Sequence, residues 1–307
     1  MRHNQNPQAI QYNLGSSFHW NNQSKTSALR RLSSESFSRL ALILARLALI
    51  LGFALATAGT AAAQVAPPVG PYGFVLNATF RIPSLHGGAA ILGLMNFDGA
   101  GNVSGTYNVE FGSGGAGQPA SIAGSFTGTY SSNPDGTGAV SIALDDGDNL
   151  TLVMVIDDRG RGLQLAVTSW CTGPDCGLFG AVVSGVGEIG SAHPVHQGFL
   201  NGSYGLQLTK SAPTPGTNLE VCSFDGAGNV TCSGTFVEPG PSVSSGTVQG
   251  TYSVNLDGTG TVTIPPQNGS PGTHQFAFVV TDGNKGLLVL QLHRAGDGVL
   301  YGIGQLQ

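Results

Sequence analysis

The sequence contains few charged residues and is particularly short of cations. Only 9% of its 307 residues are Asp, Glu, Lys or Arg. Residues 1–63 hold six of the 12 Lys and Arg but one of the 17 acids, so residues 64–307 carry a net charge of about −10. Binding to nucleic acid or to an anionic membrane requires a basic surface. We therefore expect neither partner for residues 64–307.

Beyond residue 63 the sequence also lacks helical periodicity and familiar catalytic motifs. The 48 glycines of the chain disfavour helices, and there is no G-x-S-x-G, H-E-x-x-H or phosphate-binding loop. Residues 185–190 match G-x-G-x-x-G, but a dinucleotide site requires a helix after this motif, and the segment SAHPVHQGF follows here. We interpret these glycines as part of a strand and expect no cofactor and no catalytic residues.

Cysteine is scarce, with four residues in the whole chain. Cys171 and Cys176 flank the turn-like segment TGPD, and Cys222 and Cys232 lie symmetrically about Ala227. Four cysteines allow three pairings, of which we favour 171–176 with 222–232, because each pair can face across a hairpin. Neither pair has the C-x-x-C spacing of zinc sites. We therefore expect two local disulfides rather than a metal centre.

The first 63 residues have the character of an export signal. Four arginines within residues 30–46 precede the apolar run LALILGFALATAG, which ends in the small residues Ala61 to Ala63. The alternative is a membrane anchor, but the apolar run is shorter than the roughly 20 residues of a bilayer span. We expect cleavage near Ala63, followed by a linker over residues 64–70. The mature chain is then secreted or periplasmic and not inserted in a membrane.

The remainder of the chain is a tandem repeat. The heptad FDGAGNV occurs at residues 97–103 and again at 224–230, and four further landmarks recur around it in the same order. The repeat divides the mature chain into a first domain over residues 71–190 and a second over 201–307. Residues 191–200 are then a linker.

Each repeat alternates apolar and polar residues with a period of two, which indicates half-buried strands. The alternation is clear at residues 106–111 and 251–256, and glycine-rich turns recur about every ten residues. About eight strands with short links predict an antiparallel meander, which removes exposed edges most simply by closing into a barrel. The predicted fold class is all-β, with two tandem eight-stranded up-and-down barrels. The alternative is two β-sandwiches.

The repeated heptad is best explained as a hairpin turn. Gly99 and Gly101 can adopt positive φ, and Asp98 and Asn102 can bond nearby backbone through their side chains. Calcium is the alternative ligand, but it needs six to eight oxygen atoms, and this loop offers two oxygen-bearing side chains. We therefore predict a structural role for both copies.

The densest acidic cluster is Asp145, Asp146 and Asp148 in the segment LDDGDN. Three carboxylates so close together are weak candidates for a cation site, with a solvated loop as the alternative. The second repeat has no acid at this connection, so any such site belongs to the first domain alone.

The histidines offer little chemistry from sequence alone. His193 and His196 form the motif HPVH within the predicted linker, without a nearby Cys or Glu to complete a metal site. His274 and His293 lie in or beside strands of the second repeat, and we interpret both as surface or hydrogen-bonded residues.

The landmarks resemble those of a known group of proteins. The order G-x-Y, D-G-x-G-N, G-T-Y and D-G-T-G is similar to that of uncharacterised secreted tandem β-repeat proteins of soil bacteria, notably Acidobacteria, over nearly all of residues 71–307. That resemblance implies no activity. The openings at Tyr72 and Tyr204 also loosely resemble the G-x-W of lipocalin and avidin barrels, with Tyr in place of Trp and without the Arg that packs on that ring in lipocalins. This likeness implies a barrel but transfers no ligand.

These observations favour an exported, non-catalytic protein whose barrels bind a small apolar molecule or a glycan. A structural or adhesive surface module is the main alternative, because the outer faces of the predicted strands are rich in Ser, Thr and Asn. A barrel enzyme is a further alternative. A sixteen-stranded outer-membrane barrel is disfavoured, because aromatic girdles are not evident and the chain ends in Gln307.

Overall fold

The computed structural model describes residues 64–307 of the chain with short gaps. The described residues are 64–82, 85–112, 121–172, 175–177, 181–191, 194–211, 215–237, 243–266, 272–292 and 298–307. They belong to one compact unit, and the predicted export signal lies outside them. Within the described residues, no helix has both the length and the apolar character needed to cross a membrane.

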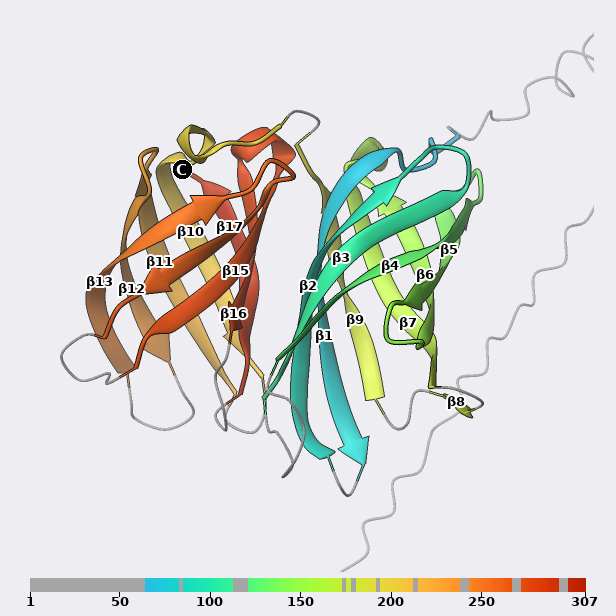
Figure 1. The fold of residues 1–307 in the computed structure, drawn as a ribbon, viewed down its shortest axis with the longest axis horizontal. Helices are drawn as coiled ribbons and strands as arrows, with labels where there is room; N and C mark the ends of the chain where they lie inside the picture. The colour runs from blue at the N-terminus through green and yellow to red at the C-terminus, as the bar shows by residue number, and fades with distance from the viewer. Residues whose placement is uncertain are drawn as a thin grey trace, which may run out of the picture. The chain divides into compact units, whose positions relative to one another are not determined.

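The first repeat forms a closed antiparallel barrel (Figure 1). Each strand pairs with the next along the chain, and the last strand pairs with both β7 and β1, which closes the sheet. The short β8 (Asp175–Gly177) adds to β7 alone. The barrel strands are β1 (Gly70–Ile82), β2 (Leu85–Phe97), β3 (Asn102–Phe111), β4 (Ser121–Ser132), β5 (Thr137–Leu144), β6 (Asn149–Asp157), β7 (Gly162–Thr172) and β9 (Ala181–Ile189).

The second repeat forms an equivalent barrel, closed by pairing of its last strand with its first. The predicted eight-stranded meander barrels are therefore confirmed, and the sandwich alternative is wrong. The strands are β10 (Asn201–Lys210), β11 (Gly216–Asp225), β12 (Asn229–Val237), β13 (Val243–Val254), β14 (Thr259–Ile264), β15 (His274–Thr281), β16 (Gly286–Leu292) and β17 (Leu300–Leu306). Three short 3-10 helices, η1 (Asp158–Gly160), η2 (Gln197–Phe199) and η3 (Asp282–Asn284), lie between strands.

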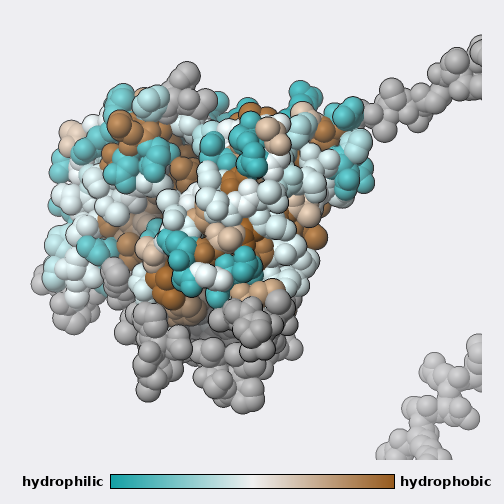
Figure 2. All heavy atoms as spheres, turned by 45° about the vertical axis from the view of Figure 1, so that its right-hand side comes forward, coloured by the Kyte–Doolittle hydropathy of each residue, from teal (hydrophilic) through white to brown (hydrophobic). Residues whose placement is uncertain are grey.

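Alternation along each strand sends apolar side chains inward and polar ones outward. In β3, Val103, Tyr107 and Val109 are buried, whereas Ser104 and Thr106 are exposed. On the face that Figure 2 shows, hydrophobic residues are interspersed among polar ones. The period-two pattern in the sequence therefore places the core inside the barrels.

Both copies of the heptad form the same turn. Asp98 Oδ1 accepts hydrogen bonds from the backbone N–H groups of Ala100 and Asn102 at 2.7 and 2.9 Å, and Asp98 Oδ2 accepts from Asn102 Nδ2 at 2.6 Å. Gly99 and Gly101 have φ values of 76° and 100°, which favour glycine. Asp225 in the second copy makes the same three bonds at 2.8, 2.9 and 2.6 Å. Both carboxylate oxygens of each Asp thus stabilise the turn.

These hydrogen bonds make the turn sensitive to acid. The donors from Asn229 and Ala227 lower the pKa of Asp225 from its ordinary value of 3.8 to about 2. Because this folded-state pKa is depressed, the stabilisation is present above pH 3.8 and is lost as the pH falls towards 2. We expect Asp225→Ala to lower the midpoint of thermal unfolding at pH 7 and to have a much smaller effect at pH 2, as measured by circular dichroism. An equal loss at both pH values would contradict this role of the ionised carboxylate.

One end of each barrel is filled by three aromatic rings, and we call it the aromatic end. In the second barrel, Phe224 packs edge-on between Tyr204 and Tyr252, with ring centroids 5.5 and 5.0 Å apart. The Tyr252 hydroxyl donates a hydrogen bond to Leu200 O at 2.8 Å. The Tyr204 hydroxyl donates to Asn284 O in η3. The corresponding rings of the first barrel are Tyr72, Phe97 and Tyr130.

The segment before each barrel packs against its aromatic end. Val65 N donates to Pro134 O at 3.0 Å, and Val195 N donates to Leu256 O at 2.9 Å. Pro134 and Leu256 occupy equivalent places before the two D-G-T-G turns. Val195 is fully buried. The described parts of the two predicted linkers therefore contribute to the cores as well as connecting elements.

The two barrels pack against each other along β1 and β2 on one side and β15 and β16 on the other. Outward-facing Val75 and Leu92 form one buried cluster with Val279, Leu288 and Leu290. Residues 277–281 of β15 and residues 286–291 of β16 are consequently buried on both faces. This apolar interface was not predicted from the period-two pattern.

Polar contacts border the same interface. Thr281 Oγ1 donates a hydrogen bond to Glu188 Oε2 at 2.7 Å, and Arg161 forms an ion pair with Asp282. A single β-bridge also joins Gly190 to Thr281. Polar residues near the end of each barrel thus add to the contacts that join the two domains.

Candidate binding cavity in the second barrel

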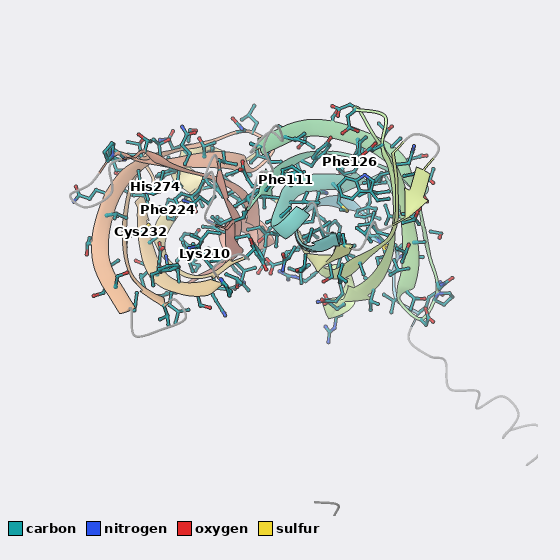
Figure 3. All side chains as sticks on the ribbon, turned by 90° about the horizontal axis from the view of Figure 1, so that it is seen from below. Phe111, Phe126, Lys210, Phe224, Cys232 and His274 are labelled. Carbon is teal, nitrogen blue, oxygen red and sulfur yellow. A yellow bond between two sulfur atoms is a disulfide. The ribbon has the colours of Figure 1, made fainter. Side chains whose placement is uncertain are left out.

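The interiors of the two barrels differ in how completely they are filled. The second barrel encloses a cavity of about 440 Å³, whereas a space of about 60 Å³ lies inside the first. Figure 3 shows Phe126 within the first barrel and Phe224, Cys232 and His274 within the second. The duplicated fold therefore contains one packed barrel and one hollow barrel.

The difference arises from side-chain size at equivalent inward positions. Equivalence follows from the shared heptads and from the matching tyrosines of the aromatic ends. At three pairs of equivalent positions the first barrel has the larger residue and the second barrel the smaller one. These pairs are Phe74 and Leu206, Tyr107 and Gly234, and Phe126 and Val248. The reverse exchange, in which the second barrel has the larger residue, occurs at Val109 and Phe236 and at Leu152 and Phe276, so part of the space is refilled.

The cavity wall is apolar over most of its surface. Leu206, Leu208, Val230, Val262 and Val289 point inward from four different strands. Such a wall offers no hydrogen bonds, so a ligand in contact with it gains free energy mainly by leaving water.

The other end of the same interior is polar, and we call it the polar end. Its residues are Lys210, Asn218, Glu220, Ser244, His274 and Gln291, most of which lie at or next to the last or first inward positions of their strands. The equivalent residues of the first barrel are Ala78, Ile91, Gly93, Ile122, Leu150 and Val167. A shared fold that accepts small or apolar residues at all six positions does not itself require polar ones.

Glu220 is the acid of the polar end. Asn218 Nδ2 donates a hydrogen bond to Glu220 Oε1, and Glu220 Oε2 lies 3.6 Å from Cys222 Sγ. Burial raises the pKa of the Glu220 carboxyl, an effect that the Asn218 bond opposes. The carboxyl therefore gains a proton more readily than a solvated glutamate.

His274 and Gln291 form a second polar group on the neighbouring strands β15 and β16. Gln291 is only 3% exposed, and its Nε2 lies 3.3 Å from His274 Nδ1. Gln291 Oε1 has no hydrogen-bond partner among the described residues. A buried acceptor without a partner costs about 1–3 kcal/mol.

Lys210 is buried at the polar end, with 1% of its surface exposed. Its Nζ lies 5.6 Å from the centroid of the Phe236 ring, a cation–π geometry. Phe236 lines the cavity, but Lys210 itself does not. Figure 3 shows Lys210 within the second barrel.

One predicted disulfide is present in the cavity wall. Cys222 and Cys232 are bonded and directly opposed in the register of β11 and β12, as the position of the heptad predicted. Their sulfurs and a Glu220 carboxylate oxygen lie as close together as the ligand atoms of a metal site. A disulfide, however, provides no thiolate to bind a metal. Cys171 is disulfide-bonded and pairs in backbone register with Cys176, whose side chain lies outside the described residues.

The acidic cluster of the first barrel is divided among separate partners. Asp145 accepts hydrogen bonds from Ser125 N and Oγ at 2.7 and 2.9 Å, which lowers its pKa. Asp148 Oδ2 accepts from Trp170 Nε1 at 2.7 Å. Asp146 Oδ1 accepts from the backbone N–H of Asp148 at 3.0 Å. These bonds explain the three acids as parts of a loop.

The remaining sequence motifs lie away from the cavity. Residues 185–190 run through β9 and its final bridge, so their interpretation as a strand is confirmed. His196 is exposed and packs edge-on against Phe199. His193 and His293 lie outside the described residues.

Sequence reasoning missed the residues that form the polar end. Glu220, Lys210 and Gln291 were not singled out, and His274 was interpreted without its partner. A comparison of the two repeats position by position contained a signal, because Glu220, Lys210 and Gln291 all replace apolar or small residues of the first repeat. No protein-family model and no curated protein matches the sequence.

Proposed function

We propose that this protein is a non-catalytic binding protein that holds a small, mainly apolar molecule inside its second barrel. The observation that carries the proposal is the cavity of about 440 Å³, which falls within the range of about 300–1,000 Å³ typical of ligand pockets. The first barrel is packed and supports the second through the interface of β1 and β2 with β15 and β16.

The lining favours an apolar molecule over a glycan. Sugars need many hydrogen-bonding groups along their length, whereas the polar side chains are a minority of the residues that line this cavity. We propose an exported protein as the setting, because the disulfide in the cavity wall suits an oxidising compartment. A structural or adhesive module would have no use for a hollow interior.

Binding of an apolar dye tests the proposal. We expect Nile red to bind the protein with a rise in fluorescence, and we expect Leu206→Phe combined with Val248→Phe to abolish this rise. These substitutions introduce the ring found at each equivalent position of the first barrel, so they fill the cavity within a fold that already accommodates them. A matched control is Leu219→Phe combined with Val221→Phe, which makes the same changes on the exposed outer face of β11.

The outcomes separate the candidate functions. Dye binding that survives in the filled variant would contradict binding inside the second barrel. Extraction of the purified protein with organic solvent, followed by mass spectrometry, then identifies the natural ligand. Failure of both dye and extract to show any bound molecule would favour the structural or adhesive role.

A further inference from the structure

We propose that the natural ligand carries an uncharged hydroxyl group that donates a hydrogen bond to Gln291 Oε1. This inference rests on the proposed function, because it assigns the chemical class of the molecule in the second barrel. The ligand is thus a long-chain or cyclic alcohol, with its hydrocarbon part against the apolar wall and its hydroxyl group at the polar end.

The contacts of Gln291 show which of its two amide atoms lacks a hydrogen-bond partner. Gln291 points inward on β16, where it follows the inward residues Leu287 and Val289 and faces Phe276 across the register. Its Nε2 lies 3.3 Å from His274 Nδ1, which gives the amide N–H an acceptor. The remaining amide atom is the oxygen, which is buried without a partner among the described residues, on a side chain that lines the cavity. The site therefore presents a buried acceptor that needs a donor.

The first barrel shows that the fold does not require an amide at this position. The equivalent residue there is Val167, which is buried and packs in the core. An apolar residue at position 291 would avoid the cost of an unpaired acceptor. A ligand that donates a hydrogen bond explains the glutamine, because it removes that cost only when it is bound.

Charge distinguishes a hydroxyl from a carboxylate head group. The titratable residues that line the cavity are Glu220 and His274, and no Lys or Arg is among the lining residues that the structure describes. Lys210, which is buried but does not line the cavity, has its Nζ 5.6 Å from the centroid of the Phe236 ring. A ligand carboxylate would face Glu220 and could only accept hydrogen bonds, so it would leave Gln291 Oε1 unpaired.

Three ligands of equal chain length test the inference in the intact protein. Decanol can donate a hydrogen bond, whereas decyl methyl ether and decanoate can only accept. We expect decanol to displace Nile red at a concentration about tenfold lower than the ether does, the ratio that follows from pairing one buried acceptor. In Gln291→Met, which preserves length without hydrogen bonding, we expect this ratio to fall to about one.

Control variants and alternative outcomes complete the experiment. Gln207→Met makes the same change on the exposed outer face of β10 and should keep the tenfold ratio, while Gln291→Val supplies the residue of the first barrel should the Met variant fold poorly. Equal displacement by all three ligands, or preference for the ether or decanoate, would overturn the hydroxyl assignment and leave the binding function intact. Dye binding without displacement by any of the three ligands would also overturn the hydroxyl assignment, and lack of dye binding would overturn both proposals.

Discussion

Replacement of Leu290 by Asp is expected to uncouple the two barrels, so that one thermal unfolding transition becomes two. Leu290 is fully buried on the outer face of β16, in a cluster with Val75 and Leu92 of the first barrel. A carboxylate at this point would be buried without a partner, at a cost of about 4 kcal/mol or more. Parting of the barrels brings the carboxylate into water and is the least costly response.

Differential scanning calorimetry measures this outcome directly. The barrels of the unchanged protein share an apolar interface and are expected to unfold together. Leu219→Asp provides the matched control, because Leu219 is 58% exposed on the outer face of the same barrel. That control should retain a single transition at a nearly unchanged midpoint. A single unshifted transition for the Leu290 variant would show that the interface contributes little to stability.

The barrels and their turns could be predicted because they depend on local patterns. Alternation with a period of two specifies one buried face per strand, and short links restrict the order of strands to a meander. The heptad fixed the register of one hairpin, since Phe224 opposes Val230 and Cys222 opposes Cys232, as expected. Because the same sequence signals occur in both repeats, each repeat supported the barrel prediction for the other.

The interface between the barrels was missed because it breaks that pattern. Outward positions of β15 and β16 were expected to be polar, yet Val279, Leu288 and Leu290 lie there and are buried. Unbroken apolar runs such as GLLVL are typical of strands covered on both faces. This run was therefore the available evidence that a second layer packs on the barrel.

The cavity could not be predicted, for a different physical reason. Its volume is the difference between the volume that the whole barrel encloses and the summed volume of the inward-facing side chains from eight strands. Exchange of Phe126 for Val248 empties space, while exchange of Val109 for Phe236 fills it. No local sequence pattern indicates this net change in side-chain volume. The polar end was easier to detect, because a change such as Val167 to Gln291 is visible once the repeats are aligned.

Truncation of the central aromatic residue should destabilise both barrels, but only in the second barrel should it also increase the stabilisation that an apolar ligand provides. Phe224 and Phe97 occupy the same place in the heptad and are 5% and 1% exposed. Replacement of either by Ala is expected to cost about 3–5 kcal/mol, because the void left by the ring is only partly refilled. Chemical denaturation with urea measures this loss for each variant.

The rise in unfolding midpoint that a ligand causes should differ between Phe224→Ala and Phe97→Ala, because the two substitutions leave their voids in different barrels. Phe224 lines the cavity of the second barrel, so its removal extends a space that already admits a ligand. Phe97 lies in the first barrel, whose interior offers only about 60 Å³. A ligand that binds the folded state alone raises stability according to its concentration and affinity. Nile red or decanol should therefore raise the unfolding midpoint of Phe224→Ala by more than it raises that of the unchanged protein, and should raise that of Phe97→Ala only by the amount seen for the unchanged protein. A larger effect of the ligand on both variants would show that the two interiors are alike in solution.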